Sequence, residues 1–368
     1  MAWLVVAAAT AALAAGMARL GVPSATLFAA LLAGLGVALS GWPRTRWRRG
    51  ERLELPPRVA QGAQAVLGVL SGALLQPDTL AQLGASWAPV LAAVLATLLV
   101  SVLAGLLLGL RRDVDAATGS FAMVAGGASG LTAIAGELGA DQRVVAVVQY
   151  LRVLLILLAM PVVAVLLGGG SGAAAPAASG GGSSGGLTAS AAPWWLDLLF
   201  TAVVAVAGTW LARLAKLPAG PLLGPMVLAA AVSATGLAQG ATVPGPVLQV
   251  AFALIGLQVG LSFTRSNLRT VGRVLPTALL LTVGVIAATA AVGVPLLHLA
   301  GASTLDAYLA TTPGGLYAVV ATSADSGGDT TLVLAVQVLR LLVMLLLAPL
   351  IGAALGRGGR RRRSHARR

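Results

Sequence analysis

Long apolar stretches follow one another along almost the whole of this chain. Twelve can be drawn, six in each half, with short charged or glycine-rich segments between them. They cover residues 3–19, 23–40, 59–76, 86–110, 116–136, 144–167, 194–212, 217–237, 246–263, 274–299, 307–322 and 330–355. A transmembrane helix needs about 20 consecutive, mainly apolar residues. The pattern therefore predicts an all-α integral membrane protein.

Composition favours the same class of protein. Apolar residues make up 58% of the 368 positions and charged residues 10%, and the mean hydropathy is +0.94. Such a chain lacks the polar surface needed to coat a soluble protein of this size. The first apolar stretch has no basic segment before it and leads directly into the second. We therefore interpret it as a membrane helix and not as a signal peptide.

Cysteine is absent, which excludes disulfides, thiolate metal sites and cysteine nucleophiles. The two histidines, His298 and His365, cannot supply a histidine-rich metal centre by themselves. We therefore expect neither a metal nor a cofactor.

The two halves of the chain repeat one pattern at a constant offset in residue number, called the repeat offset below. Both carry GG-x9-[ED]-x-G-x-D-x7-Q-x2-R, and agreement of so many polar and glycine positions by chance is improbable. The aligned pairs are Gly126 with Gly314, Gly127 with Gly315, Glu137 with Asp325, Asp141 with Asp329, Gln149 with Gln337, Arg152 with Arg340, Gly68 with Gly256 and Gly72 with Gly260. We divide the chain into a first membrane repeat (1–167), a Gly/Ser/Ala-rich linker (168–192), a second membrane repeat (193–356) and a basic tail (357–368).

Basic residues indicate how the repeats are oriented, because they mark the cytoplasmic side of a membrane. The net charge of +13 comes almost wholly from arginine, in clusters at residues 44–58, 111–112, 213–216, 265–273 and 357–368. Twelve full crossings would place two of these clusters outside. If segments 116–136 and 307–322 enter and return, every cluster and both termini are cytoplasmic. We therefore predict two inverted repeats, with about ten full crossings plus two broken or re-entrant segments.

Gly126-Gly127 and Pro313-Gly314-Gly315 lie at the centres of these two segments. Glycine and proline are where a helix is expected to break. The alternative is that the paired glycines only allow close packing of helices in lipid.

Two arginines lie deep inside apolar segments. Arg152 and Arg340 would each cost on the order of 3 kcal/mol or more in the bilayer, so each must face a partner or water. At about 100° per residue, Asp141 lies within about 20° of the helix face that carries Arg152. Gln149 is near that face, and the second repeat has the same spacing.

We interpret these positions as a site for a small, anionic solute near the middle of the membrane. Backbone N–H groups freed at a helix break favour an anion, and arginine can fork onto a carboxylate. The substrate-binding candidates are Gly126, Gly127, Ser129, Gln149, Arg152, Pro313, Gly314, Gly315, Gln337 and Arg340. The candidates for binding a coupling proton or sodium ion are Glu137, Asp141, Asp325 and Asp329. The alternative is that the two arginines only hold the repeats together through buried ion pairs.

The leading hypothesis is a secondary transporter or exporter of a small anionic solute, coupled to protons or sodium. The alternative is a membrane-embedded ligand sensor or regulator that affects gene expression indirectly. We expect no enzyme, because no catalytic pair stands outside the repeated motif. The basic tail is expected to contact anionic lipid and not nucleic acid, and the sequence leaves open whether the chain forms a homo-oligomer.

The motifs at residues 125–152 and 313–340 resemble those of the duplicated-domain AbrB-type membrane proteins of bacteria. Each half of those proteins carries a PGG or GGAS-like turn, an acidic-Gly-x-Asp stretch and Q-x-x-R, although Ala125 stands here where the second copy has Pro313. The resemblance implies a multi-pass protein of the bacterial inner membrane. Members carry the labels "ammonia monooxygenase" and "AbrB family transcriptional regulator". This sequence argues against both, because a copper enzyme needs clustered histidines and no segment resembles a DNA-binding domain.

Overall fold

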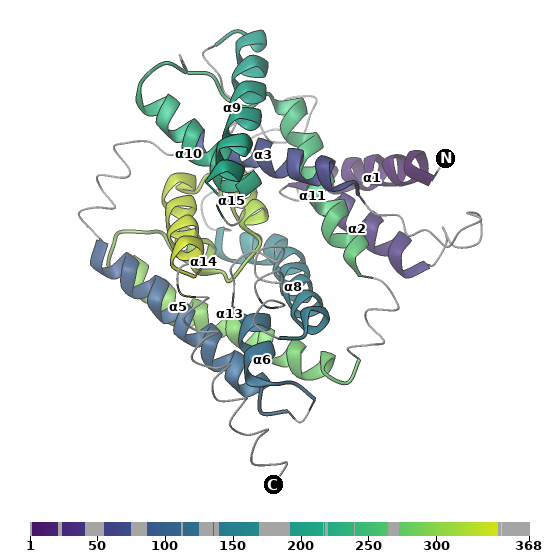
Figure 1. Ribbon diagram of the computed structural model, residues 1–368, viewed down its shortest axis with the longest axis vertical. Helices are drawn as coiled ribbons and strands as arrows, with labels where there is room; N and C mark the ends of the chain where they lie inside the picture. The colour runs from purple at the N-terminus through teal and green to yellow at the C-terminus, as the bar shows by residue number, and fades with distance from the viewer. Residues whose placement is uncertain are drawn as a thin grey trace. The chain divides into compact units, whose positions relative to one another are not determined.

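The computed structural model is helical throughout the part of the chain that it describes (Figure 1). It describes residues 2–20, 24–40, 55–74, 87–111, 113–124, 135, 140–168, 192–215, 217, 220–238, 240–263, 272–344 and 347. The predicted all-α fold class is confirmed for these residues.

Helices occupy the predicted apolar segments. The first repeat contains α1 (Ala2–Arg19), α2 (Ala25–Ser40), α3 (Pro57–Ala73), α5 (Trp87–Leu108), α6 (Ala116–Met123) and α8 (Gln142–Gly168). The second contains α9 (Trp194–Leu214), α10 (Gly220–Ala234), α11 (Gly245–Ser262), α13 (Leu275–His298), α14 (Thr304–Thr311) and α15 (Leu316–Asp325). The last helix, Thr330–Met344, is called the C-terminal helix below.

The eleventh apolar segment is two helices and not one. α14 ends at Thr311 and α15 begins at Leu316, so the break falls at Pro313-Gly314-Gly315 as predicted. Gly314 and Gly315 have φ angles of +130° and +72°, which L side chains rarely adopt. In the first repeat α6 ends at Met123, and the predicted break at Gly126-Gly127 lies outside the described residues.

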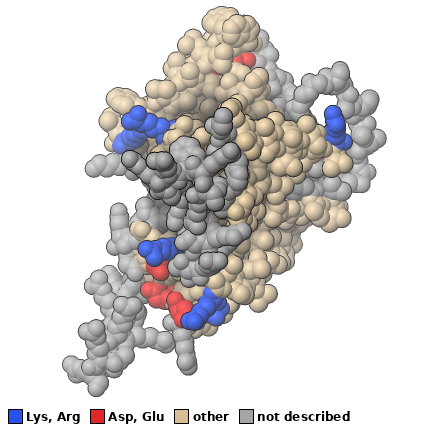
Figure 2. Space-filling view, turned by 90° about the vertical axis from the view of Figure 1, so that its right-hand side faces the viewer, with Lys and Arg blue, Asp and Glu red and all other residues tan. Residues whose placement is uncertain are grey.

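Five of the described helices are long and apolar enough to cross a membrane: α5, the Gln142–Met160 part of α8, α9, α11 and α13. Figure 2 shows a face on which charged side chains form only a few separate patches. On α9, Trp194 and Trp210 are both largely exposed near opposite ends of the helix, as is typical of aromatic anchors at the two membrane surfaces. These features support a multi-pass membrane protein, while the number of crossings stays a prediction.

The chain forms two compact units, and each unit draws on both repeats. Unit 1 comprises Met1–Ala85, Leu157–Thr264 and Leu316–Leu334. Unit 2 comprises Ser86–Ile156, Arg265–Gly315 and Ala335–Arg368. The first three helices of both repeats therefore belong to unit 1, and α5, α6, α13 and α14 belong to unit 2. The repeats are divisions of the sequence, and their predicted boundaries, with the linker and the tail, fall partly outside the described residues.

Unit 1 pairs the second helix of each repeat with the third helix of the other. α2 packs against α11, and α10 packs against α3. A Cβ atom at Gly68 of α3 would collide with the backbone at Leu222 of α10, and one at Gly256 of α11 would collide with the backbone at Leu27 of α2. The glycines aligned between the repeats therefore allow matching close helix contacts.

Unit 2 is built on α5 and α13, which pack side by side (Figure 1). α6 packs against α5, and α14 packs against α13. A Cβ atom at Gly105 of α5 would lie 2.5 Å from the Cα atom of Ser120 in α6. Gly293 of α13, which aligns with Gly105 at the repeat offset, is in similarly close contact with Thr311 of α14. In each repeat, therefore, the short helix packs directly against a glycine of the long helix.

Candidate functional site

The short helices α6 and α14 end inside unit 2. After α6 the backbone of Val124 is extended, with φ −72° and ψ 131°. After α14 the backbone of Thr312 also leaves the helix, with φ −57° and ψ 126°. The end of a helix leaves up to four carbonyl groups without an intrahelical partner. In a membrane interior each such group costs several kcal/mol unless a donor reaches it.

Gln149 and Arg152 of α8 supply these donors in the first repeat. Gln149 donates from Nε2 to the carbonyl oxygens of Phe121 at 2.8 Å and Val124 at 2.7 Å. Arg152 donates from Nη1 to the carbonyl oxygen of Met123 at 2.8 Å and from Nη2 to Oε1 of Gln149 at 2.5 Å. Both side chains are buried, with 0% and 2% of their surfaces exposed. Their three-residue spacing places them on one face of α8.

Gln337 and Arg340 of the C-terminal helix make the matching bonds in the second repeat, and Arg340 makes one more. Gln337 donates from Nε2 to the carbonyl oxygens of Leu309 at 2.8 Å and Thr312 at 3.2 Å. Arg340 donates from Nη1 to the carbonyl oxygens of Thr312 at 2.5 Å and Thr311 at 3.3 Å, and from Nη2 to Oε1 of Gln337 at 2.5 Å. The acceptors are related by the repeat offset. The duplication seen in the sequence is thus reproduced in hydrogen bonds.

Neither guanidinium group forms an ion pair with a carboxylate that the structure describes. The carbonyl groups at a helix C-terminus carry a partial negative charge and offset part of each positive charge. The Nε atoms of Arg152 and Arg340 have no hydrogen-bond partner among the described residues. The alternative of two buried ion pairs therefore finds no support in this part of the chain. In the described part of the chain, two buried charges and two Nε–H donors without an acceptor remain.

Arg152 also contacts the helix break of the other repeat. A Cβ atom at Gly314 would lie 3.3 Å from Nε of Arg152, and one at Gly315 would lie 3.4 Å from the side chain of Ile156 in α8. The predicted Pro313-Gly314-Gly315 break is therefore next to the predicted cation. Gly126, Gly127 and Ser129 lie outside the described residues, so the matching contact of Arg340 stays a prediction.

Asp141 and Asp329 lie at the start of helices, away from the arginines. Oδ1 of Asp141 accepts a hydrogen bond from the backbone N–H of Arg143 at 2.9 Å, and Oδ1 of Asp329 accepts one from Leu332 at 2.9 Å. Both carboxylates are exposed and cap the helices that follow. Eleven residues separate Asp141 from Arg152, which is about 16 Å along a helix. Asp141 precedes α8 as its cap, so its predicted place on the helix face of Arg152 stays a prediction.

The two remaining acidic candidates cannot be placed. Glu137 lies outside the described residues. Asp325 is the last residue of α15, and its side chain is outside the described part. Their predicted role in binding a coupling ion stays a prediction.

Asp306 is a buried acid that the repeat alignment missed. It lies in the first turn of α14 with 6% of its surface exposed. Its N–H donates to Oγ of Ser303 at 3.0 Å, and Ser303 donates back to Oδ2 at 2.7 Å. Oδ1 has no partner among the described residues. The Ser-x-x-Asp spacing of a capping box could have indicated this position, but its aligned residue, Thr118, is not acidic.

Comparison with known proteins identifies the family. The family model described as "Transition state regulatory protein AbrB" matches residues 45–356. "Putative regulator AbrB" of Escherichia coli (strain K12) is 32% identical over 329 residues, which is 89% of this chain and 89% of that protein. "Uncharacterized protein YhjN" of Bacillus subtilis (strain 168) is 30% identical over 295 residues, which is 78% of this chain and 76% of that protein. The match includes both glycine-to-arginine motifs, so this chain belongs to the AbrB family.

Proposed function

We propose that this protein is a secondary transporter or exporter of a small anionic solute, coupled to protons or sodium. One observation carries the proposal: Arg152 and Arg340 are buried in one unit, and neither has a carboxylate partner among the described residues. A buried charge without a counter-charge costs several kcal/mol. A carboxylate or phosphate that accepts from the two Nε–H donors, which have no acceptor among the described residues, would remove much of that cost.

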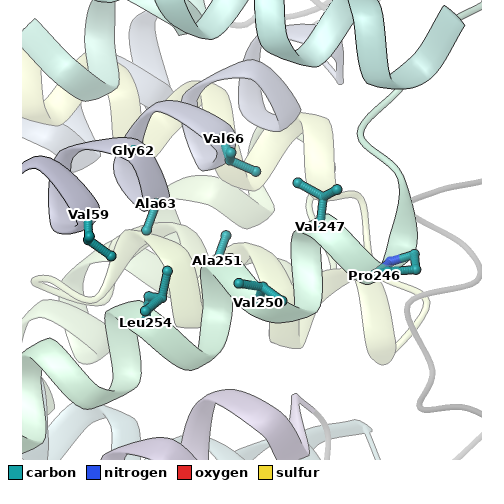
Figure 3. A pocket seen from close by; sticks show the side chains of 9 residues that line it. All are labelled: Val59, Gly62, Ala63, Val66, Pro246, Val247, Val250, Ala251 and Leu254. Atoms are coloured by element: carbon teal, nitrogen blue, oxygen red, sulfur yellow. The ribbon is translucent and has the colours of Figure 1, made fainter. Parts of the chain in front are cut away.

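The helices that end beside the arginines are interrupted helices, a feature of secondary transporters. Interrupted helices from two repeats that meet at one point are typical of secondary transporters. The inverted arrangement is supported by α3 and α11, which have aligned sequences. In Figure 3, Val59 of α3 lies nearest Leu254 of α11, while Val66 lies nearest Val247, so the two helices run in opposite directions.

The coupling ion would bind at an acidic group. Asp306 is the best-placed acid among the described residues, because it is buried in the same unit as the arginines and has one free oxygen. Asp141 and Asp329 are exposed caps, and Glu137 and Asp325 stay predicted coupling groups. We propose that Asp306 binds the proton or sodium ion, alone or with one of these acids.

A ligand sensor is the second candidate function. The family description and the name of the Escherichia coli relative both refer to regulation. A sensor would bind the same anion at the arginines without moving it across the membrane, and its effect on gene expression would be indirect. We propose no enzymatic activity, so the ligand should be recovered chemically unchanged.

Thermal unfolding of the purified full-length protein tests the anion site. We expect an anionic metabolite to raise the unfolding temperature of the wild type. Arg152→Gln and Arg340→Gln keep a hydrogen-bond donor for the helix end but remove the charge. Each variant should bind that anion about 30-fold more weakly, or weaker still, which corresponds to about 2 kcal/mol of binding free energy. Arg143→Gln, an exposed position on the same helix, is the matched control and should leave the affinity unchanged.

Two results would contradict the proposal. An anion response that survives in both arginine variants would show that the arginines only cap the helix ends. Stabilisation by neutral or cationic solutes alone would show that the solute class is wrong. Counterflow of the radiolabelled anion in proteoliposomes then separates the two candidate functions, because a transporter exchanges the label across the membrane and a sensor does not.

A further inference from the structure

An apolar groove of about 420 Å³ opens between α3 and α11 in unit 1. Figure 3 shows the residues that line it, and all of them are aliphatic, glycine or proline. Such a groove offers no hydrogen bond to a polar solute. It is separate from the arginine site, which belongs to unit 2.

The two walls of the groove are copies of one another. Val59 of α3 aligns with Val247 of α11 at the repeat offset, and Ala63 aligns with Ala251. Because the helices run in opposite directions, each wall presents its residues in reverse order (Figure 3). The apolar lining is therefore similar along the whole groove.

The ends of the groove differ in charge. Pro246 lines one end, and the residue aligned with it in α3 is Arg58. Arg58 is exposed at the start of α3, four residues before Gly62, which places it on the helix face that lines the groove. A second cation reaches the same turn of α3 as Arg58, because Nη2 of Arg213 donates to Oε1 of Gln61 at 2.9 Å, although Gln61 itself does not line the groove. Among the described residues, the end at Arg58 is therefore the basic one.

We propose that the groove binds an acyl chain of an anionic phospholipid, with the phosphate at Arg58 and Arg213. An apolar channel whose described cations lie at one end matches a molecule that has a long tail and one anionic head. Arginines near a membrane surface attract anionic lipids. Both cations belong to basic clusters predicted to be cytoplasmic, so the lipid comes from the inner leaflet. This inference does not depend on the proposed transport function.

Lipid retention by the full-length protein in detergent tests the proposal. Native mass spectrometry would measure binding of dioleoyl phosphatidylglycerol and dioleoyl phosphatidylcholine, added at equal concentrations. We expect the wild type to retain phosphatidylglycerol preferentially. A Cβ atom at Gly62 would meet no other atom within 4 Å, so a side chain has room to start there, and Gly62→Leu should lower the bound phosphatidylglycerol several-fold by occupying the groove. Gly284→Leu, at an equally open glycine of α13, should change nothing.

The arginines have a separate test. Arg58→Gln with Arg213→Gln should leave total lipid binding unchanged. The preference for phosphatidylglycerol should fall about fivefold for each arginine removed, which is ~1 kcal/mol each. Equal phosphatidylglycerol retention in Gly62→Leu, Gly284→Leu and the wild type would overturn the proposal. So would an unchanged preference in the double arginine variant, or loss of a dimer mass in Gly62→Leu without loss of lipid, which would assign the groove to a second copy of the chain.

Discussion

The short helices α6 and α14 are alike at their C-terminal ends and different at their N-terminal ends. Both C-terminal ends receive matching bonds, from Gln149 and Arg152 in one repeat and from Gln337 and Arg340 in the other. The bonds match because both ends have carbonyl groups that must find donors.

At the N-terminal ends the acidic residue changes place. α6 is capped by Asp115, which is exposed and accepts from the N–H of Thr118 at 2.7 Å. α14 is capped by Ser303, and its acid is Asp306, which is buried. The C-terminal ends have therefore kept one structural solution, while the N-terminal ends have diverged. A function that only one repeat performs, such as binding the coupling ion, is therefore more readily assigned to the N-terminal end of α14.

The largest expected effect tests whether the C-terminal ends are equivalent. Gln149→Leu and Gln337→Leu each remove the donor to two carbonyl groups and the acceptor of an arginine N–H. Each should lower the free energy of unfolding by roughly 3 kcal/mol or more, and the two effects should be similar. Denaturant unfolding of the detergent-solubilised protein measures them. Gln142→Leu, at the exposed start of α8, should cost little. A large loss in one repeat only would show that the two ends are not equivalent.

A smaller effect is expected at the break after α14. Gly314→Ala forces a side chain into a backbone with φ +130° and toward Nε of Arg152. We expect a loss of about 2 kcal/mol in the free energy of unfolding, together with weaker anion binding. The control is Gly301→Ala, where φ is +82° but a Cβ atom would meet nothing within 4 Å. If both variants lose equal stability and keep anion affinity, the contact with Arg152 is irrelevant to the site.

The helix caps before α8 and the C-terminal helix should contribute less. Asp141→Ala and Asp329→Ala each remove an N-cap acceptor, which typically costs about 1 kcal/mol. The same variants test their predicted role in coupling. A cap alone predicts lower stability with normal ion dependence of uptake in proteoliposomes. Loss of the sodium or proton dependence in either variant would restore that residue as a coupling group.

The sequence predicted the helices, and it singled out the paired Gln and Arg positions, for physical reasons. Long apolar runs have few alternatives to helix in a membrane, and costly polar residues at matching positions stand out against an apolar background. Pro313-Gly314-Gly315 likewise predicted a break, because those residues do not continue a helix.

The partners of the arginines were not predictable from spacing. The freed N–H groups of a break were expected to form the site, yet Arg152 binds the carbonyl oxygen of Met123, 29 residues earlier in the chain. Which end of a broken helix lies beside α8 depends on tertiary packing. The helical angle alone suggested that Asp141 and Arg152 belong together, but an angle says nothing of the distance along the helix axis, and Asp141 caps α8 from outside it. The sequence comparison did not identify Asp306, because the aligned residue is Thr118. A search for residues common to both repeats passes over a position that is acidic in only one of them.

The smallest expected effect on stability lies at Asp306, and it decides what the divergent ends mean. Asp306→Asn keeps an oxygen that can accept from Ser303 and removes the charge, so the free energy of unfolding should fall by no more than about 1 kcal/mol. If Asp306 binds the coupling ion, uptake in proteoliposomes should lose its response to an imposed sodium or proton gradient. Counterflow exchange of the anion, which needs no gradient, should continue.

The matched variant is Asp115→Asn at the start of α6. Its carboxylate caps a helix of the same length but is exposed, and an exposed group exchanges ions freely with water and gains little from binding one. Uptake by this variant should therefore keep its gradient response. If both variants respond like the wild type, the change of acid between the repeats serves only helix capping, and coupling must depend on a different acid. If both lose the response, Asp115 and Asp306 both take part in coupling, although one is exposed and the other is buried.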